Sequence, residues 1–482
     1  MSYEPVIGLE IHTQLQTESK LFCGCSTRFG AAPNTNTCPV CLGLPGTLPV
    51  LNRRAVELAI RAALALGCTV HERSVFARKN YFYPDLPKGY QISQYDRPLA
   101  TEGVLEFEAR GDARRVGIIR VHLEEDAGKS LHEGLPDSDR ATALDFNRSG
   151  VPLIEIVSHP DVRHAADAAE CFSRLRAILV ATGVTDGNME EGSLRCDANV
   201  SVRRSGTTPF GVKTEIKNLN SFRHVQRALE HEIDRQVALL EGGGRVEHET
   251  RLWDPTAGRT LSMRSKEDAH DYRYFPEPDL PPVLIETAWI DAIRAALPEL
   301  PDARRRRFIA HYGLSEYDAA LLTQSTATAV YFEATAAASG NAKAASNWIM
   351  GELTRKMNEL GVSIDAVPLP PAALAALIRL VDSGTISGPT AKDVFEKMYG
   401  SGRSAADIVE AEGLGRIDDE GAVEGAVRTV LAANGDAVAQ YRAGKRQTFG
   451  FLVGQVIKSM GGKANPALVN TIVRRELGRE PA

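Results

Sequence analysis

Four cysteines near the N-terminus have the spacing of a metal site. Cys23 and Cys25 are separated by one residue, and Cys38 and Cys41 by two. Structural zinc takes four thiolate ligands in a tetrahedron, and two close pairs joined by a short loop can supply them. The alternative is four unliganded buried cysteines. Because four protein ligands leave no open position for a substrate, we expect zinc to stabilise this loop and the catalytic groups to lie elsewhere.

Acidic residues and one histidine on expected strands are the candidates for catalysis. Alternation of apolar and polar residues near the N-terminus places Glu10 and His12 on one strand face, about 6–7 Å apart. Glu124 and Glu125 end another expected strand, and Glu155 lies in an apolar stretch, where an unpaired charge is costly. Converging carboxylates suit Mg²⁺ and phosphoryl transfer. Taken singly, each acid could instead be a surface group or a salt-bridged core group.

Standard nucleotide and nucleophile motifs are missing from the sequence. The segment EEDAGKS ends like a phosphate-binding loop, but Leu123 stands where the motif needs its first glycine. Neither G-x-G-x-x-G nor G-x-S-x-G occurs. We therefore expect any ATP site to have an unfamiliar framework, and a stand-alone glutaminase is disfavoured.

Residues 78–98 are expected to form a long loop that contains Lys79, Lys88 and four tyrosines. Two interpretations stay open. The aromatic residues could simply pack a Pro/Gly-rich loop, or the cations and aromatics could line a polar site, since long loops in compact domains are often functional.

A basic stretch stands near the C-terminus of an otherwise acidic chain, whose net charge is −6. Residues 442–475 contain no Asp or Glu, and they contain the cations Arg442, Lys445, Arg446, Lys458, Lys463, Arg474 and Arg475. Such a surface suits the phosphates of a nucleic acid, and the candidates for these contacts are Arg442, Lys445, Arg446, Lys458 and Lys463. The alternative is an ordinary solvated helical surface.

The expected elements give an α+β fold. Strands are expected at residues 6–14, 118–124, 152–157 and 194–203, and helices at 53–66, 164–182 and 222–240. Strands and helices do not alternate strictly, so we expect a mixed or antiparallel sheet. Strand signals fade after residue 298. We therefore expect an α/β cradle at 1–292, a helical domain at 293–406 and a small helical tail at 407–482.

Composition indicates an ordinary globular protein. Hydrophobic residues make up 43% and charged residues 24% of the 482 residues. No apolar run is long enough to span a bilayer, and no basic segment followed by an apolar one marks a signal peptide. Seven cysteines, clustered at metal-like spacing, fit a reducing compartment. We expect a cytoplasmic protein.

Several long motifs resemble one family. They are VIGLEIHTQL, RKNYFYPDLPKGYQISQYD, VHLEEDAGKS, DFNRSGVPLIEIVS, MEEGSLRCDANVSVR, EIKNLNSF and DYRYFPEPDL, continued by SNWIMGEL and GFLVGQVIKSMGGKANPALVN. With them the chain resembles, nearly end to end, the GatB family, which provides the B-type subunit of the bacterial Asp/Glu-tRNA amidotransferase.

The resemblance implies an ATP-dependent ligase that works inside a heterotrimer. It implies that the chain phosphorylates the side-chain carboxylate of Asp-tRNA(Asn) or Glu-tRNA(Gln), and that ammonia then displaces the phosphate. The ammonia would come from a glutaminase partner of the amidase family, and a small third partner would hold the two together. The implied cofactors are ATP, Mg²⁺ and structural Zn²⁺. Which misacylated tRNA is the substrate stays open.

The resemblance also assigns roles by matching residues. It implies catalytic roles for Glu10, His12, Glu124, Glu125 and Glu155, with magnesium on Glu10, His12, Glu125 and Glu155. It places Lys79 and Lys88 at an ammonia channel and zinc on the four cysteines. Some members of the family have these cysteines and bind zinc there, and others lack them and still function. The alternative function is a catalytically inactive, zinc-stapled tRNA-binding scaffold. That alternative is disfavoured because a scaffold has no need for the acids.

Overall fold

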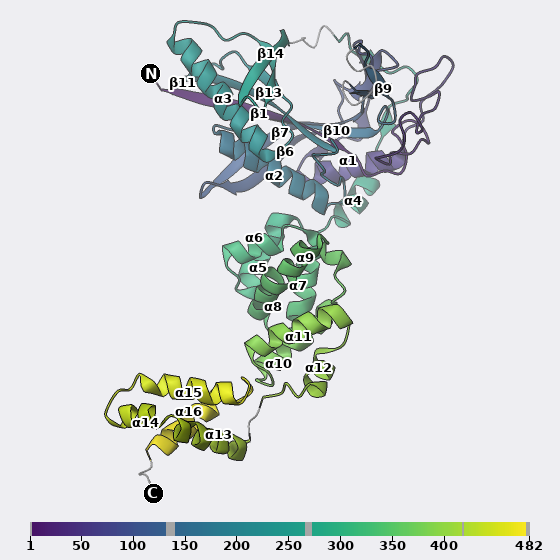
Figure 1. Cartoon of the computed structure of the whole chain (residues 1–482). Helices are drawn as coiled ribbons and strands as arrows, with labels where there is room; N and C mark the ends of the chain where they lie inside the picture. The colour runs from purple at the N-terminus through teal and green to yellow at the C-terminus, as the bar shows by residue number, and fades with distance from the viewer. Residues whose placement is uncertain (1, 132–139, 266–271, 417–418, 479–482) are drawn as a thin grey trace. The chain divides into compact units, whose positions relative to one another are not determined.

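The computed structural model describes residues 2–131, 140–265, 272–416 and 419–478. The chain forms two compact units, Met1–Asp302 and Ala303–Ala482 (Figure 1). The first unit contains a large mixed sheet and the second is helical, so the expected α+β class is confirmed. The three-domain division stays a prediction. Among the described residues, no helix combines the length and the apolar character that crossing a membrane requires.

A sheet of nine strands, counted over the described residues, is the framework of the first unit. Neighbouring strands are antiparallel except for one parallel pair, β12 and β13. The order across the sheet is β14 (Arg259–Ser265), β13 (Glu249–Asp254), β12 (Thr214–Lys217), β11 (Leu194–Arg204), β1 (Tyr3–Gln14), β10 (Pro152–Ser158), β7 (Asp112–Glu125), β6 (Ala100–Ala109) and β2 (Thr69–Val70). The four strands expected from the sequence are β1, β7, β10 and β11, and the mixed sheet is confirmed.

One face of this sheet is apolar and covered by helices. These are α1 (Arg53–Ala65), α2 (Ala165–Ala181) and α3 (Phe222–Glu241), which confirm the three expected helices (Figure 1). The side chain of Asn52 accepts hydrogen bonds from two backbone N–H groups at the start of α1, and Ser221 caps α3 in the same way. Leu9 and Ile11 of β1 share the core with Phe172 of α2. The polar side chains of the central strands therefore point to the other face.

Shorter elements lie beside the large sheet. They are a three-stranded sheet of β15 (Phe275–Pro276), β4 (Phe76–Asn80) and β5 (Tyr90–Gln94), the pair β3 (Arg73–Ser74) and β16 (Val283–Leu284), the pair β8 (Lys129–Leu131) and β9 (Ala143–Asp145), and the helix α4 (Thr287–Ala295). The prediction of one long loop at residues 78–98 was therefore wrong in part, because β4 and β5 pair with each other, with Lys79 opposite Gln91. These strands are short and mostly polar, so they carry no clear alternation.

The second unit contains helices and two hydrophobic cores. Its elements are α5 (Pro301–Tyr312), α6 (Glu316–Leu322), α7 (Thr326–Ser339), α8 (Ala342–Trp348), a π-helical turn (Ile349–Leu353), α9 (Thr354–Leu360), a 3₁₀ turn (Ile364–Ala366), α10 (Pro371–Asp382), α11 (Gly388–Ser401), α12 (Ala405–Ala411), α13 (Glu420–Ala433), α14 (Gly435–Arg442), α15 (Thr448–Ser459) and α16 (Pro466–Leu477). One core is formed by residues between Phe308 and Val409, and the other by residues between Val423 and Leu477.

Candidate functional site

The register of the central strands brings the expected acids together. His12 of β1 lies opposite Glu155 of β10, and Glu155 lies opposite His122 of β7. On the other side of β1, Glu10 lies opposite Asp197 of β11. Side chains of directly paired residues point to the same face of a sheet, here the face opposite the helices.

Four of the predicted residues form one cluster. Nε2 of His12 lies 3.2 Å from Oε2 of Glu155, 3.5 Å from Oε1 of Glu124 and 3.9 Å from Oε1 of Glu10. Nε2 of His122 lies 3.6 Å from Oε2 of Glu124 and 3.7 Å from Oε2 of Glu155. Glu124, Glu155 and His122 are buried. We call Glu10, His12, His122, Glu124 and Glu155 the acid cluster.

Opposite charges keep Glu124 and Glu155 of the acid cluster ionised. Burial opposes the charge on Glu155, but the pKa of this carboxyl still lies well below its usual range because of His122, His12 and Lys79. Burial likewise disfavours the charged imidazole of His12, yet Glu155, Glu124 and Glu10 raise its pKa to about 9. The neighbouring Glu155 raises the pKa of Glu10. The protein thus concentrates negative charge at one place on the sheet.

The donor set of the acid cluster fits a divalent cation. One ligand atom each from His12, Glu124 and Glu155 lie within 4.8 Å of one another, and the same holds for Glu10, His12 and Asp197. Mg²⁺ prefers oxygen ligands at about 2.0–2.1 Å, so carboxylates at these separations can share one ion. A histidine is an unusual Mg²⁺ ligand, and direct coordination by His12 stays a prediction.

A polar pocket of about 330 Å³ opens beside the acid cluster. Glu10, Glu155 and His122 line it, together with cations and aromatic residues: Lys79, Arg120, Lys213, Lys217, Tyr272 and Tyr274. The ammonium of Lys79 lies 4.9 Å from the centre of the Tyr272 ring. Burial opposes the charge on Lys79, but Tyr274, Glu124 and Glu155 raise its pKa, so this lysine stays charged. Fixed cations beside a cluster of carboxylates that could hold a metal ion suit a polyphosphate.

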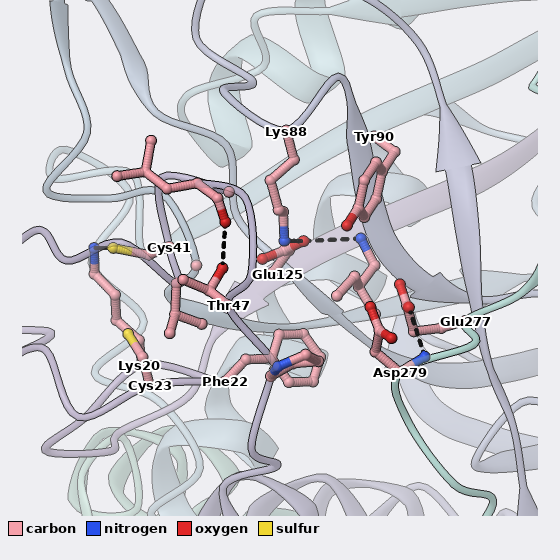
Figure 2. A pocket seen from close by; sticks show the side chains of 16 residues that line it. Lys20, Phe22, Cys23, Cys41, Thr47, Lys88, Tyr90, Glu125, Glu277 and Asp279 are labelled. Atoms are coloured by element: carbon pink, nitrogen blue, oxygen red, sulfur yellow. Dashed lines mark hydrogen bonds and ion pairs between the residues drawn. The ribbon is translucent and has the colours of Figure 1, made fainter.

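Glu125 lies apart from the acid cluster. Its carboxylate accepts a hydrogen bond from the backbone N–H of Ile92 at 2.9 Å and forms an ion pair with Lys88. Figure 2 shows both side chains in a separate pocket, with the sulfurs of Cys23 and Cys41 on one side. The structure thus brings Glu124 beside His12 and places Glu125 with Lys88. The magnesium role of Glu125 stays a prediction, and its surroundings differ from those of the other acids.

The four cysteines are close enough to hold one metal ion. Their sulfur atoms all lie within 4.8 Å of one another, although they come from two separate segments of the loop. In a tetrahedral zinc site with Zn–S bonds of about 2.3 Å, neighbouring sulfurs are about 3.8 Å apart, so the cluster fits with small adjustments. A hydrogen bond from Cys23, with Lys20 nearby, lowers the pKa of Cys41 to about 4. A thiolate is the form that binds zinc.

The basic residues of the tail occupy the last helices of the second unit. Arg442 ends α14, Lys445 and Arg446 follow it as exposed residues, Lys458 is on α15, and Lys463 follows α15. Some of the charge is used within the protein: the Lys463 ammonium donates to the carbonyl of Gly413 at 2.7 Å. Lys445, Arg446 and Lys458 are exposed, so they are the stronger candidates for phosphate contacts.

Comparison with known proteins identifies the family. Residues 5–291 match the GatB/GatE catalytic domain, and residues 330–477 match the GatB domain. The chain belongs to the GatB family. It is 55% identical over 477 residues to a Geobacter sulfurreducens protein named as the B-type subunit of aspartyl/glutamyl-tRNA(Asn/Gln) amidotransferase, covering 99% of this chain and all of the relative. Proteins of that name from Carboxydothermus hydrogenoformans (55%) and Anaeromyxobacter dehalogenans strain 2CP-1 (56%) match over 99% of both chains.

In this GatB-family chain the whole acid cluster and both lysines of the resemblance lie within the matched catalytic domain. Sequence reasoning did not select His122, Asp197 or the tyrosines Tyr272 and Tyr274. His122 carried a usable signal, because it stands two residues before Glu124 on the same strand and must share its face. The others come from segments whose pairing partners are far away in the sequence.

Proposed function

We propose that this chain is the tRNA-dependent, ATP-consuming component of an Asp/Glu-tRNA amidotransferase. It phosphorylates the side-chain carboxylate of Asp-tRNA(Asn), Glu-tRNA(Gln) or both, and ammonia then replaces the phosphate to give the amide. The observation that carries this proposal is the convergence of Glu10, Glu124, Glu155 and His12 beside a pocket lined by lysines.

The chemistry explains why such a site is needed. A carboxylate is a poor acyl donor to ammonia because oxide is a very poor leaving group, and an acyl phosphate supplies a good one. Glu124 and Glu155, or Glu10 and Asp197, would hold Mg²⁺ beside His12, and the ion would neutralise charge on the phosphates. Lys79 and its neighbours in the pocket hold the phosphate oxygens. Positioning and electrostatics by these residues carry most of the catalysis.

The pocket lined by Lys88 and Glu125 could serve as a separate route for ammonia. Successive residues of β5 point to opposite sides: Ile92 lines the pocket of Lys88 and Glu125, whereas the Ser93 hydroxyl donates to Glu124 at 3.0 Å. In a heterotrimer with an amidase-family glutaminase and a small third chain, ammonia released by the glutaminase passes Lys88 and Glu125 and reaches the acid cluster. Only the thickness of one strand separates the two pockets.

The assembled complex tests the proposal. In His12→Ala and Glu155→Gln, we expect tRNA-dependent ATP hydrolysis and amide formation to fall by about 100-fold or more, because charge stabilisation of the transferring group is lost. Glutamine hydrolysis should continue, since it takes place in the partner. Glu106→Gln, an exposed acid on β6, is the matched control. Wild-type amidation in both site variants would place the active site elsewhere and favour a non-catalytic scaffold.

A further inference from the structure

The cysteine cluster and the Lys88–Glu125 ion pair share one pocket. This pocket has a volume of about 100 Å³ and is lined by Cys23 and Cys41 on one side and by Lys88 and Glu125 on the other (Figure 2), and Gly43 also lines it. Only 8% of the Lys88 side chain and 3% of the Glu125 side chain are exposed. The metal loop, residues 38–46, is therefore one wall of the pocket that holds this ion pair.

Gly43 brings the backbone of the metal loop against Lys88. Its φ is +67°, and an added Cβ would overlap Cγ of Lys88 and lie 3.2 Å from its Cα. The stem of Lys88 thus fills the space above Gly43, which only glycine leaves free. The direction of the Lys88 ammonium therefore depends on the position of the metal loop.

A second contact ties the cluster to the other side of the pocket. The ammonium of Lys20, which is fully buried, lies 3.5 Å from Sγ of Cys41 and donates to the carbonyls of Asn36 at 2.7 Å and Phe146 at 3.2 Å. A Cβ on Gly150 would lie 3.4 Å from Cβ of Cys41 and 3.9 Å from Oε2 of Glu125. Cys41 and Glu125 are thus separated by a single glycine.

We infer that the metal at the four cysteines positions Lys88 against Glu125 and so controls the passage of ammonia through this pocket. The inference rests on the proposed function, and it assigns the metal more than loop stability. With the loop held, the Lys88 ammonium pairs with Glu125, whose carboxylate also accepts a hydrogen bond from the Ile92 N–H. With the loop released, Lys88 loses the wall behind its stem, and ammonia escapes to solvent before it reaches the acid cluster.

Hydrogen exchange of the full chain tests the coupling without any activity. We expect the amide of Ile92 to exchange faster after a chelator has removed the metal, because its acceptor Glu125 is no longer held. Peptides from β1 and β10 serve as an internal reference for intact folding and should be unchanged. Equal exchange at Ile92 with and without metal would overturn the inference.

Two glycine variants of the assembled complex provide a matched pair. Gly43 and Gly46 both have positive φ, but only at Gly43 does an added Cβ meet Lys88, because a Cβ at Gly46 has nothing within 4 Å among the described residues. We expect Gly43→Ala to raise the glutamine hydrolysed per amide formed by roughly tenfold or more, because a displacement of about 1 Å can cost up to about 100-fold in rate. Gly46→Ala should keep the wild-type ratio.

Ammonium chloride as the amide donor separates this inference from the proposed function. Because added ammonium does not depend on delivery from the partner, its use by Gly43→Ala should fall far less than the use of glutamine. An equal loss with both donors, or no loss with either, would overturn the positioning role of the metal loop. The proposed function is tested instead with the His12 and Glu155 variants, so the proposed function and this inference can be contradicted separately.

Discussion

At the scale of single residues, the acid cluster contains a buried charge, Glu155, that its neighbours stabilise. Glu155 is buried in the middle of an apolar strand, which is costly for a charge. Its contacts with His12 and His122 offset that cost. Nδ1 of His122 has no hydrogen-bond partner within the part of the chain that the structure describes. Such a concentration of buried, mutually stabilised charge is typical of a functional site.

At the residue scale we predict one zinc ion per chain on the four cysteines. Cys38→Ser should abolish zinc binding and lower the thermal stability of the first unit, because the binding energy of a structural metal is folding energy. Elemental analysis and thermal unfolding of the purified full chain measure both effects.

Cys68→Ser controls for the loss of a thiol. Cys68 is buried and outside the cluster, so this variant should keep its zinc even if its stability falls. The prediction would be contradicted if the wild-type protein contained no zinc and Cys38→Ser had the same stability as the wild type.

At the element scale, the end of β7 serves two pockets with consecutive residues. Side chains alternate along a strand, so Glu124 points to the acid cluster and Glu125 to the pocket of Lys88. A register slip by one residue would exchange these two surroundings. The pairing of β7 with β10 therefore matters as much as the identity of the acids.

Helix α3 carries another buried carboxylate, Glu232, which makes a pH-dependent contribution to stability. Glu232 is fully buried and accepts hydrogen bonds from Arg235, Gln236 and Thr260. Burial opposes its charge, but these donors lower its pKa below the usual value. The carboxylate thus contributes stability above the unfolded-state pKa of about 4.3. That contribution disappears as the pH falls through the lowered pKa of the folded state.

We predict that Glu232→Gln destabilises the first unit by about 2 kcal/mol at pH 7, because hydrogen bonds to a charged group are lost. The difference from the wild type should shrink as the pH falls below about 4. Thermal unfolding of both proteins from pH 7 to pH 3 measures it, with Glu241→Gln, an exposed acid on the same helix, as control. A difference that is constant with pH would mean that the charge of Glu232 is not responsible.

At the scale of the whole molecule, the acid cluster and the basic residues of the tail lie in different compact units. The acid cluster lies within Met1–Asp302, and the basic tail lies within Ala303–Ala482. The acceptor end of a tRNA offers few phosphates, so a second contact away from that end should supply much of the affinity. Each phosphate contact releases counterions and makes binding depend on salt.

We predict that reversing Lys445 and Arg446 to Glu weakens binding of the misacylated tRNA and reduces the salt dependence. The log–log slope should fall by about 0.7–0.9 for each lost phosphate contact. Titrations at several salt concentrations measure both quantities. The matched control reverses Lys392 and Lys397 of α11, which form ion pairs with Glu352 and Glu412, and changes the net charge equally. Identical slopes in the two variants would show that the tail is an ordinary solvated surface.

Local patterns in the sequence determined the elements of the site. Alternation in β1 placed Glu10 and His12 on one face, and capping residues with apolar periodicity placed α1 and α3. The cysteine cluster was also predictable, because a short loop alone brings its two pairs together. Each of these inferences uses only interactions between residues that are close in the chain.

Only the tertiary structure decided which acids meet. Glu124 and Glu125 are neighbours in the sequence, and strand register across β1, β10 and β7 sends them to different pockets. Lys88 reaches Glu125, and Tyr272 reaches Lys79, across long stretches of chain. The physical reason is that register and pocket walls arise from pairing between distant segments, whereas sequence periodicity reports only the face on which a residue lies.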